Sequence, residues 1–254
     1  MQSLYIPMSR EEFERQPFDP AWKQSYFEGH MLLTPRPVLV YATRSTSTTS
    51  TTAVGLSKLG SGQHHLILDL YLDAFEDSFE YCDWKPRHVR RDAHNIVRDL
   101  FDGAFGRPLV ILGLEDADSL NAAAAVVLKD TGVPHLQFIC VDPKSQRDGA
   151  GSRLLHASLA ELHMMGYRTL TSCFMLGNIA SRAWHWKNGF VEEPDLQIAT
   201  LELQRLATQQ RLKPDALNEQ TIDSLKRDIR EMEQSLAAGR PDQAYARDRF
   251  KIWN

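Results

Sequence analysis

The middle of the chain alternates between helical and strand patterns of hydrophobic residues. From His64 to Phe105 apolar side chains recur at helical spacing, with a break near Trp84-Lys85-Pro86, so two helices are expected. Further apolar periodicity predicts strands at 107–113, 122–129 and 135–141, a helix at 151–165, a strand at 170–176, a helix at 179–187 and a strand beginning at 189–191. This order indicates an α/β or α+β layer structure around one sheet.

The N-terminal region has a pattern of its own. Ser9 and Glu12 form a capping-box pattern that predicts a short helix. A β-hairpin is expected over 23–42. Its second strand contains Pro35 and Pro37, which cannot donate to a ladder, so this part of the strand is expected at a sheet edge.

Two segments mark the expected divisions of the chain. Residues 45–52 are eight hydroxyl residues in a row, which indicates a linker or, alternatively, an exposed Thr-rich strand edge. In the tail, apolar residues at near-heptad spacing predict a helix that docks on its own domain or forms a coiled coil: Leu217, Ile222, Leu225, Ile229, Met232 and Leu236. The expected parts are an extension (1–44), a linker (45–63), a core domain (64–204) and a helical tail (205–254).

Composition narrows the function classes. The 29 basic and 33 acidic residues give a net charge of −4, which argues against non-specific nucleic-acid binding. With 43% hydrophobic residues the chain can bury a core. The three cysteines (Cys82, Cys140, Cys173) fit neither a disulfide framework nor a metal knuckle, so we expect no metal and a reducing, cytoplasmic location. No window is apolar enough to suggest a signal peptide or a membrane span.

The segment FICVDPKSQRDGAGSRLL, residues 138–155, carries candidate chemistry. An apolar strand ends at Val141, and Gly149 and Gly151 lie where the next helix begins. The first amides of a helix have no internal partners, and the helix dipole favours negative charge, so such a loop can hold an anion. A tight turn would explain two glycines equally well. Gln146 stands where a dinucleotide-binding loop would have its first glycine, and no Walker A pattern is present.

This loop resembles motif A of the GNAT superfamily of N-acetyltransferases, in which Gln/Arg-x-x-Gly-x-Gly/Ala holds the pyrophosphate of acetyl-coenzyme A. The matching residues are Gln146, Gly149 and Gly151. A second segment, from Asn178 to Phe190, resembles motif B of the same family. The resemblance covers about 66–193 and suggests a bacterial subgroup with an N-terminal hairpin extension. It implies a mixed, mostly antiparallel central sheet flanked by helices, with that extension and a C-terminal helical tail.

The resemblance also implies how acetyl-coenzyme A would bind. Its pantetheine arm would pair with the backbone of one strand, at Ile139, Cys140 and Val141. The pyrophosphate would be held by the loop and the helix start: Gln146, Arg147, Asp148, Gly149, Ala150, Gly151 and Ser152. The Arg153 side chain would add charge or lie as an ordinary solvated arginine. Asn178 would contact the pantetheine region, or would only cap the helix that follows it.

Catalytic residues are implied less directly. An amine attacks the thioester once a base has removed its proton, and an acid can protonate the departing thiolate, leaving coenzyme A as product. Many family members use a motif-B tyrosine as acid; here that position is His185, which would be the acid or a packing residue. The base position falls on His135, which could instead be a solvated strand end, with Glu115 and Asp116 as rivals.

Two further groups complete the expectations. Cys140 and Cys173 lie in apolar strands and are interpreted as buried structural thiols. The segment 71–84 contains only acidic charges, which would suit a cationic amine acceptor or form an exposed acidic face: Asp73, Glu76, Asp77, Glu80 and Asp83.

Three functional hypotheses follow. The first is an acetyl-coenzyme A-dependent N-acetyltransferase acting on a small amine or a protein amino group. The second is a non-catalytic module that binds coenzyme A as a sensor. The third makes the N-terminal hairpin and the C-terminal helix dimerisation elements of a homodimer.

Overall fold

A computed structural model describes residues 3–47, 55–75, 78–81, 84–116, 119–212 and 219–246. These residues form two compact units, which are treated separately below. Unit 1 contains residues 1–40, 174–181 and 192–254, and unit 2 contains 41–173 and 182–191. Five residues named in the sequence analysis lie outside the described residues: Glu76, Asp77, Cys82, Asp83 and Leu217. Most of the hydroxyl-rich segment 45–52 also lies outside them.

The expected order of helices and strands in the middle of the chain is confirmed. The elements are α2 (His64–Phe75), α3 (Pro86–Phe101), β6 (Arg107–Asp116), β7 (Ser119–Leu128), β8 (Pro134–Val141), α4 (Ala150–Met164), β9 (Thr169–Met175), α5 (Ile179–Lys187) and β10 (Val191–Glu192). They build an α/β fold with a mixed sheet, as the sequence predicts.

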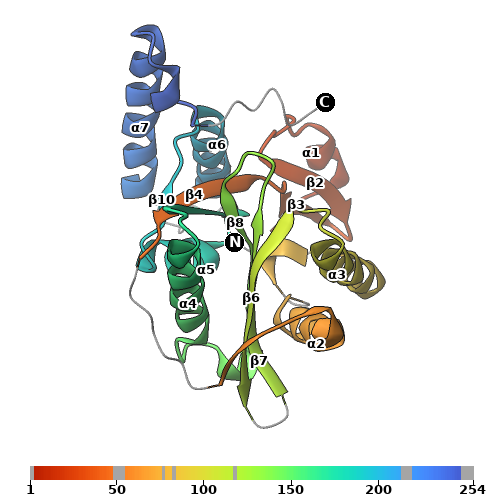
Figure 1. Cartoon of the computed structure of the whole chain (residues 1–254). Helices are drawn as coiled ribbons and strands as arrows, with labels where there is room; N and C mark the ends of the chain where they lie inside the picture. Colours follow the sequence, from red (N-terminus) through yellow and green to blue (C-terminus); the bar gives the residue numbers. More distant parts are fainter. Residues whose placement is uncertain are drawn as a thin grey trace. The chain divides into compact units, whose positions relative to one another are not determined.

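Unit 2 is built on this sheet, whose strand order is β10-β4-β9-β8-β7-β6-β5. The ends of β4 (Leu39–Ser45), β9 and β10 run on into unit 1. β6, β7 and β8 pair antiparallel, whereas β8 and β9 are parallel. α2 and α3 lie on one side of the β6–β8 strands and α4 lies on the other (Figure 1). Under α2 and α3, a core that includes Val97, Leu100 and Val127 holds this layer together by apolar burial.

β5 (Leu56–Lys58) adds an edge to the sheet. It pairs antiparallel with β6, from Leu56↔Leu114 to Lys58↔Leu112. A short 3₁₀ helix, η1 (Ser61–Gln63), follows it and leads directly into α2. The segment between 55 and 63, expected to be part of a linker, therefore contains regular structure.

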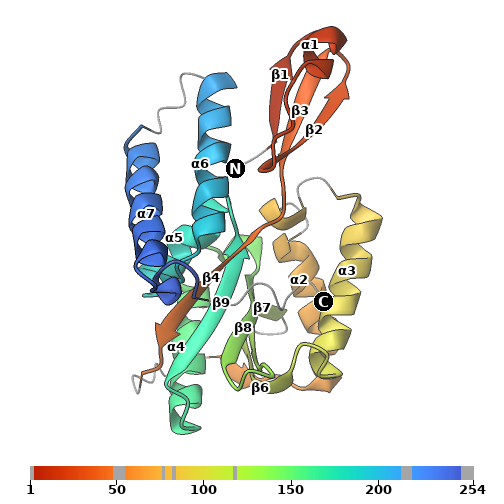
Figure 2. The ribbon, with the colours of Figure 1, turned by 90° about the horizontal axis from the view of Figure 1, so that it is seen from above.

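Unit 1 holds a second, three-stranded sheet. Its strands are β1 (Leu4–Pro7), β2 (Trp22–Phe27) and β3 (His30–Pro35), in the order β1-β3-β2. Trp22, Met31 and Leu33 form its buried core, against which Leu201 and Leu212 of α6 (Leu196–Leu212) pack. Figure 2 shows the three strands together with α1 (Arg10–Glu14).

The expected hairpin is correct in its turn and wrong in its second strand. β2 and β3 pair as predicted, but the chain leaves the strand conformation at 36–38, and β4 then joins the other sheet. β3 as a whole is the central strand of this sheet. Among the described residues β1 pairs with it only as far as Leu33, so the part at Pro35 has one described strand neighbour, β2, as expected for a proline at an edge.

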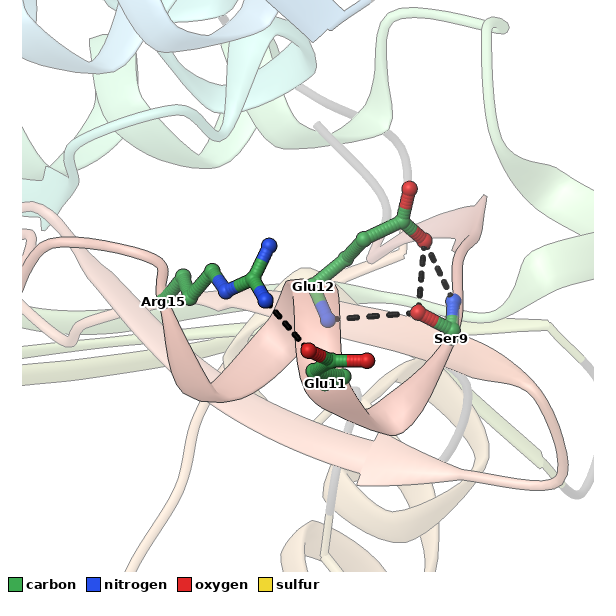
Figure 3. A network of polar contacts seen from close by, with 4 residues as sticks. All are labelled: Ser9, Glu11, Glu12 and Arg15. Carbon is green, nitrogen blue, oxygen red and sulfur yellow. Dashed lines mark hydrogen bonds and ion pairs between the residues drawn. The ribbon is translucent and has the colours of Figure 1, made fainter.

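The predicted capping box at the N-terminus is confirmed. The Glu12 amide donates to Ser9 Oγ at 3.2 Å, and the Ser9 amide donates to the Glu12 carboxylate at 2.7 Å. Figure 3 shows both contacts, together with the ion pair between Arg15 and Glu11 one turn apart. Two backbone amides that α1 leaves unpaired are thereby satisfied.

The C-terminal region consists of α6 and α7 (Glu219–Ala237). α6 begins at Leu196, upstream of the expected tail. Ile222 and Leu225 of α7 are buried against Leu206 of α6, so this helix docks on its own chain as one of the two predictions proposed. A role in dimerisation stays a prediction.

A buried arginine joins the segments of unit 1. Arg205 of α6 is 1% exposed, and its guanidinium donates to the carbonyls of Leu176, Arg36 (3.1 Å) and Ala21 (3.5 Å). It also lies over the Trp22 ring, 5.5 Å from the centroid. Burial lowers the pKa of Arg205 to about 10, so the side chain is still charged at neutral pH. One side chain thus satisfies carbonyls from three separate parts of the sequence.

We expect Arg205→Leu to lower the free energy of unfolding by about 2–4 kcal/mol, because it leaves buried carbonyls without donors. Arg211→Leu in the same helix is the matched control, since Arg211 is exposed, and its effect should stay within ~0.5 kcal/mol. Urea denaturation followed by circular dichroism measures both. Equal effects of the two variants would show that Arg205 does not hold this unit together.

Candidate functional site

The strands β8 and β9 separate after one point of contact. Among the described residues they are paired at His135↔Thr171, near the beginning of both strands. Beyond this pair β8 keeps its ladder with β7, up to Ala122↔Val141, whereas no further pair joins it to β9 in the described chain. Along this stretch the backbone groups of Cys140 face β7, as the bond from the Asp142 amide to the Asn121 carbonyl two residues later indicates, and those of Ile139 and Val141 face the β9 side. The Val141 carbonyl accepts a hydrogen bond from Gln146 Nε2 at 3.4 Å. The β9 side of this stretch can therefore pair with a ligand that lies along the strand.

A bulge marks the place where β8 turns away. Ala125 of β7 pairs with Phe138 and Val126 pairs with Leu136, so Gln137 is the extra residue. A bulge bends its strand and increases the local twist. The Gln137 side chain is held in place, since its Oε1 accepts a hydrogen bond from Lys129 Nζ at 3.0 Å. The bulge thus lies just beyond the last pair with β9.

The loop after β8 has the backbone geometry of an anion cradle. Asp142 begins it and accepts a hydrogen bond from the Lys144 amide at 2.7 Å. Arg147 and Gly149 both have left-handed backbone, with φ of +74° and +78°. Gly149 is the N-cap of α4, whose first internal bond runs from the Arg153 amide to the Gly149 carbonyl. The amides of Ala150, Gly151 and Ser152 precede that bond and have no partner within the helix.

The start of α4 is packed against the separated end of β8. A Cβ on Gly151 would lie 3.5 Å from Val141 Cγ2 and 3.8 Å from Ile139 Cδ1, and 3.5 Å from the indole nitrogen of Trp184 in α5. Gly149, in contrast, has nothing within 4 Å of such a Cβ. The positive end of the helix dipole is thereby fixed beside the strand edge and open on its outer side.

The predicted cofactor residues divide by exposure. The exposed residues are Gln146, Arg147, Asp148, Gly149 and Arg153. The buried residues are Cys140, Ala150 and Gly151, and the partly buried ones are Ile139, Val141 and Ser152. Within unit 2 the loop is therefore exposed, and the strand that leads into it is partly or fully buried.

His135 is buried at the last pair of the two strands. It is 6% exposed, and its Nδ1 lies 3.0 Å from Thr171 Oγ1. Thr171 Oγ1 donates its only proton to the carbonyl of Pro134 at 3.1 Å, so His135 Nδ1 must carry a proton and donate it. The basic lone pair is then on Nε2, which lies 3.8 Å from Cys173 Sγ. The Tyr41 ring lies 6.3 Å away, centroid to centroid.

His185 occupies the other side of the sheet. It is 3% exposed, and its Nε2 lies 2.9 Å from Ser172 Oγ. Its ring contacts those of Trp184 and Phe190, both at 5.0 Å. Because successive side chains of a strand point to opposite faces, Ser172 faces away from Thr171 and Cys173. His135 and His185 thus approach β9 from opposite faces.

The remaining predicted residues lie elsewhere. Glu115, at the end of β6, accepts a hydrogen bond from Ser57 at 2.6 Å, and β7 separates its strand from β8. The side chain of its rival Asp116 lies outside the described residues. Asn178 belongs to unit 1, where its Oδ1 accepts from the Ser181 amide at 3.0 Å, which is the N-cap role weighed as an alternative.

The two cysteines differ from each other. Cys140 is a buried structural thiol as expected; it donates to the Ala123 carbonyl, and burial raises its pKa to about 12. Cys173 is only partly buried, so the prediction of a buried thiol is wrong there. Sequence reasoning also missed Thr171. The period of a strand predicts that Thr171 and Cys173 share one face, but their position beside His135 depends on the strand register.

Within the described residues, no three potential metal-binding side chains gather at one place. No described helix is both long and apolar enough to cross a bilayer. A cytoplasmic location stays a prediction.

Comparison with known proteins gives a family match. The model of the acetyltransferase (GNAT) family matches residues 65–190. No curated protein matches the chain.

Several solved structures are similar in part. A GNAT-family acetyltransferase from Brucella melitensis, in complex with acetyl-CoA, is 20% identical with a TM-score of 0.42, over 54% of this chain and 81% of that one. An aminoglycoside 6′-N-acetyltransferase from Acinetobacter haemolyticus is 19% identical with a TM-score of 0.39, over 54% and 90%. A functionally unknown conserved protein from Staphylococcus epidermidis is 11% identical with a TM-score of 0.49, over 75% and 68%.

Proposed function

The chain belongs to the acetyltransferase (GNAT) family through its residues 65–190, and from this premise we propose that it transfers the acetyl group of acetyl-coenzyme A directly to an amine. The observation that carries the proposal is the separation of β8 from β9 beside the start of α4. An extended arm and a charged group can bind there together.

The open strand edge and the loop suit the two ends of acetyl-coenzyme A. The amides of its pantetheine arm would pair with the stretch Ile139, Cys140 and Val141, through the backbone groups that face away from β7. The pyrophosphate would lie on the amides of residues 147–152, where the exposed side chains of Arg147 and Arg153 add positive charge. The thioester supplies the activated acyl group.

His135 is the proposed base. A protonated amine has no lone pair for attack, so its proton must first be taken up. His135 Nε2 is the basic nitrogen of the ring, because Thr171 holds the proton on Nδ1. This nitrogen lies on the sheet face covered by α2 and α3, since His135 pairs with Val127 of that core. We place the amine on this face. Glu115, which bonds to Ser57, has no part in the proposal.

His185 is the proposed source of the proton for the departing thiolate. It approaches β9 from the face opposite to His135, next to Ser172. With a base on one face and an acid on the other, the amine proton and the thiolate proton would travel by separate routes. The packing of the His185 ring between Trp184 and Phe190 would fix its direction.

The acceptor would be a cationic amine, small or on a protein. Of the acidic residues predicted to attract it, Asp73 on α2 is exposed and Glu80 is partly buried. The stretch 71–84, which contains both residues, has no basic residue.

We expect Gly149→Asp to weaken binding of coenzyme A at least tenfold, because it puts a negative charge where the pyrophosphate would lie. Gly149→Asn has the same size without the charge and should weaken binding less. Gly166→Asp is the matched control: Gly166 follows the other end of α4, also has left-handed backbone and also has nothing near its Cβ position. Isothermal titration calorimetry measures all three. Equal loss in Gly149→Asp and Gly166→Asp would refute the loop assignment.

We expect His135→Gln to lower kcat/KM for acetyl transfer about 100-fold, since it removes the base. In the wild type kcat/KM should have an acidic limb, because a protonated base cannot take up the amine proton, and this limb should be absent in the variant. His94→Gln, which changes an exposed histidine of α3, is the control and should keep the limb. Coenzyme A binding without acetyl release on any amine would instead favour the sensor hypothesis.

His185→Phe separates the two roles considered for His185. The phenyl ring can occupy the same aromatic contacts but carries no proton to donate. We expect kcat to fall about tenfold if His185 protonates the thiolate. An unchanged kcat in a variant with an unchanged melting temperature would identify His185 as a packing residue.

A further inference from the structure

Cys173 lies at the closed end of the gap between β8 and β9 and has no part in the transfer reaction proposed above. Its Sγ is 3.8 Å from His135 Nε2. His135 belongs to the one described pair of the strands, His135↔Thr171, and Cys173 lies two residues after Thr171 on β9. Cys173 is a partly exposed residue, whereas Cys140 is buried. A reactive group can therefore approach it from outside.

The hydrogen bonds around His135 fix the direction of proton transfer. The Thr171 hydroxyl donates to Pro134, so it accepts from His135 Nδ1. Nε2 then has the lone pair, and the proton donor beside it is the Cys173 thiol. This is a thiol, a base and a group that orients the base, the arrangement that activates a nucleophile.

One charged group nearby, the Lys129 ammonium, favours a thiolate. Lys129 directly follows β7 and is half-buried; burial lowers its pKa, whereas the charges of Cys173 and Asp130 raise it. The Lys129 ammonium is therefore close enough to stabilise negative charge on the sulfur. From β4, the Tyr41 ring faces His135.

We propose that Cys173 is a site of reversible covalent modification, oxidised by peroxide with His135 as its base, and that its oxidation stops acetyl transfer. The claim that oxidation stops acetyl transfer rests on the proposed function, because it assumes that His135 Nε2 also accepts the proton of the amine. The same nitrogen serves the amine during transfer and the thiol when no amine is bound.

The chemistry balances with hydrogen peroxide as the oxidant. His135 Nε2 takes the thiol proton, and the sulfur attacks one peroxide oxygen. A sulfur–oxygen bond forms and the oxygen–oxygen bond breaks, so sulfur is oxidised to sulfenic acid and peroxide is reduced. The leaving hydroxide takes the proton back from His135 and departs as water. A thiol reductant reverses the step.

The reactivity is tested by treating the full chain with hydrogen peroxide and trapping sulfenic acid with dimedone. Trypsin separates the two cysteines, since Cys173 lies in the peptide 169–182 and Cys140 in 130–144. We expect Cys173 to be labelled at least tenfold faster than Cys140, and His135→Gln to slow the labelling of Cys173 about tenfold. Thr171→Val, which keeps the shape of the side chain but cannot accept from Nδ1, should also slow it.

Thermal melting of both variants checks that they are folded. A second measurement uses the wild type alone. The rate of iodoacetamide alkylation at Cys173 should reach half its maximum below pH ~8.5, which is the pKa of an ordinary thiol. The reactivity is disproved if Cys173 is labelled no faster than Cys140, or if His135→Gln leaves its rate unchanged in a folded protein.

The effect on transfer is measured separately. Peroxide should abolish most acetyl transfer by the wild type, and dithiothreitol should restore it. Cys173→Ala should keep its activity under the same treatment. Labelling of Cys173 without any loss of transfer would overturn the regulatory half of the proposal. If the untreated wild type transfers no acetyl group, the proposed function fails, and the labelling rates still decide whether the thiol is activated.

Discussion

The candidate site depends on the separation of two parallel strands that remain paired at one described point. Backbone donors and acceptors inside a sheet are normally used by the neighbouring strand, and a strand edge left open in a protein core is costly unless something pairs with it. β8 is paired with β7 along its length, yet its other edge is open beyond His135↔Thr171. The bulge at Gln137 explains how one strand can follow β7 and still leave β9. The gap is therefore a property of the fold, and a ligand that behaves as an extra strand completes the hydrogen bonding.

The helix α4 turns this gap into a site with two kinds of contact. Its first turn lies against β8, since a Cβ on Gly151 would be at van der Waals distance from Val141, Ile139 and Trp184. The left-handed backbone at Arg147 and Gly149 brings the loop around to that turn with its amides outward. An anion bound to the loop is thus placed in line with the open strand edge. A Cβ at Gly151 would make only ordinary van der Waals contacts, so the stricter backbone demand falls on Gly149, whose left-handed φ of +78° favours glycine.

Sequence patterns predicted the features that depend on neighbouring residues. The elements from α2 to β10, the capping box of Ser9 and the loop before α4 follow from local periodicity, caps and glycines, and the loop could be matched to a family on those grounds. Features that depend on pairing between distant segments were predicted poorly. The second strand of the N-terminal hairpin was predicted to run on to residue 42, but it ends at Pro35, and β4 pairs in the other sheet. Likewise, Thr171 and Cys173 meet His135 only through a parallel register that a single sequence does not specify.

The register also places a second proton donor, the Cys173 thiol, beside the proposed base. A histidine that accepts a proton from an amine must present an unprotonated nitrogen in a place from which water is largely excluded, and Thr171 achieves this by keeping the proton on Nδ1. Such a nitrogen does not distinguish an amine from any other proton donor of suitable acidity. With Cys173 next to it on the same strand face, the base that would activate the acceptor also activates a thiol. Replacing the cysteine by an inert residue would remove this second donor without altering the strand pattern, so the sensitivity of this base to the state of Cys173 is the functional consequence of having a thiol at that position.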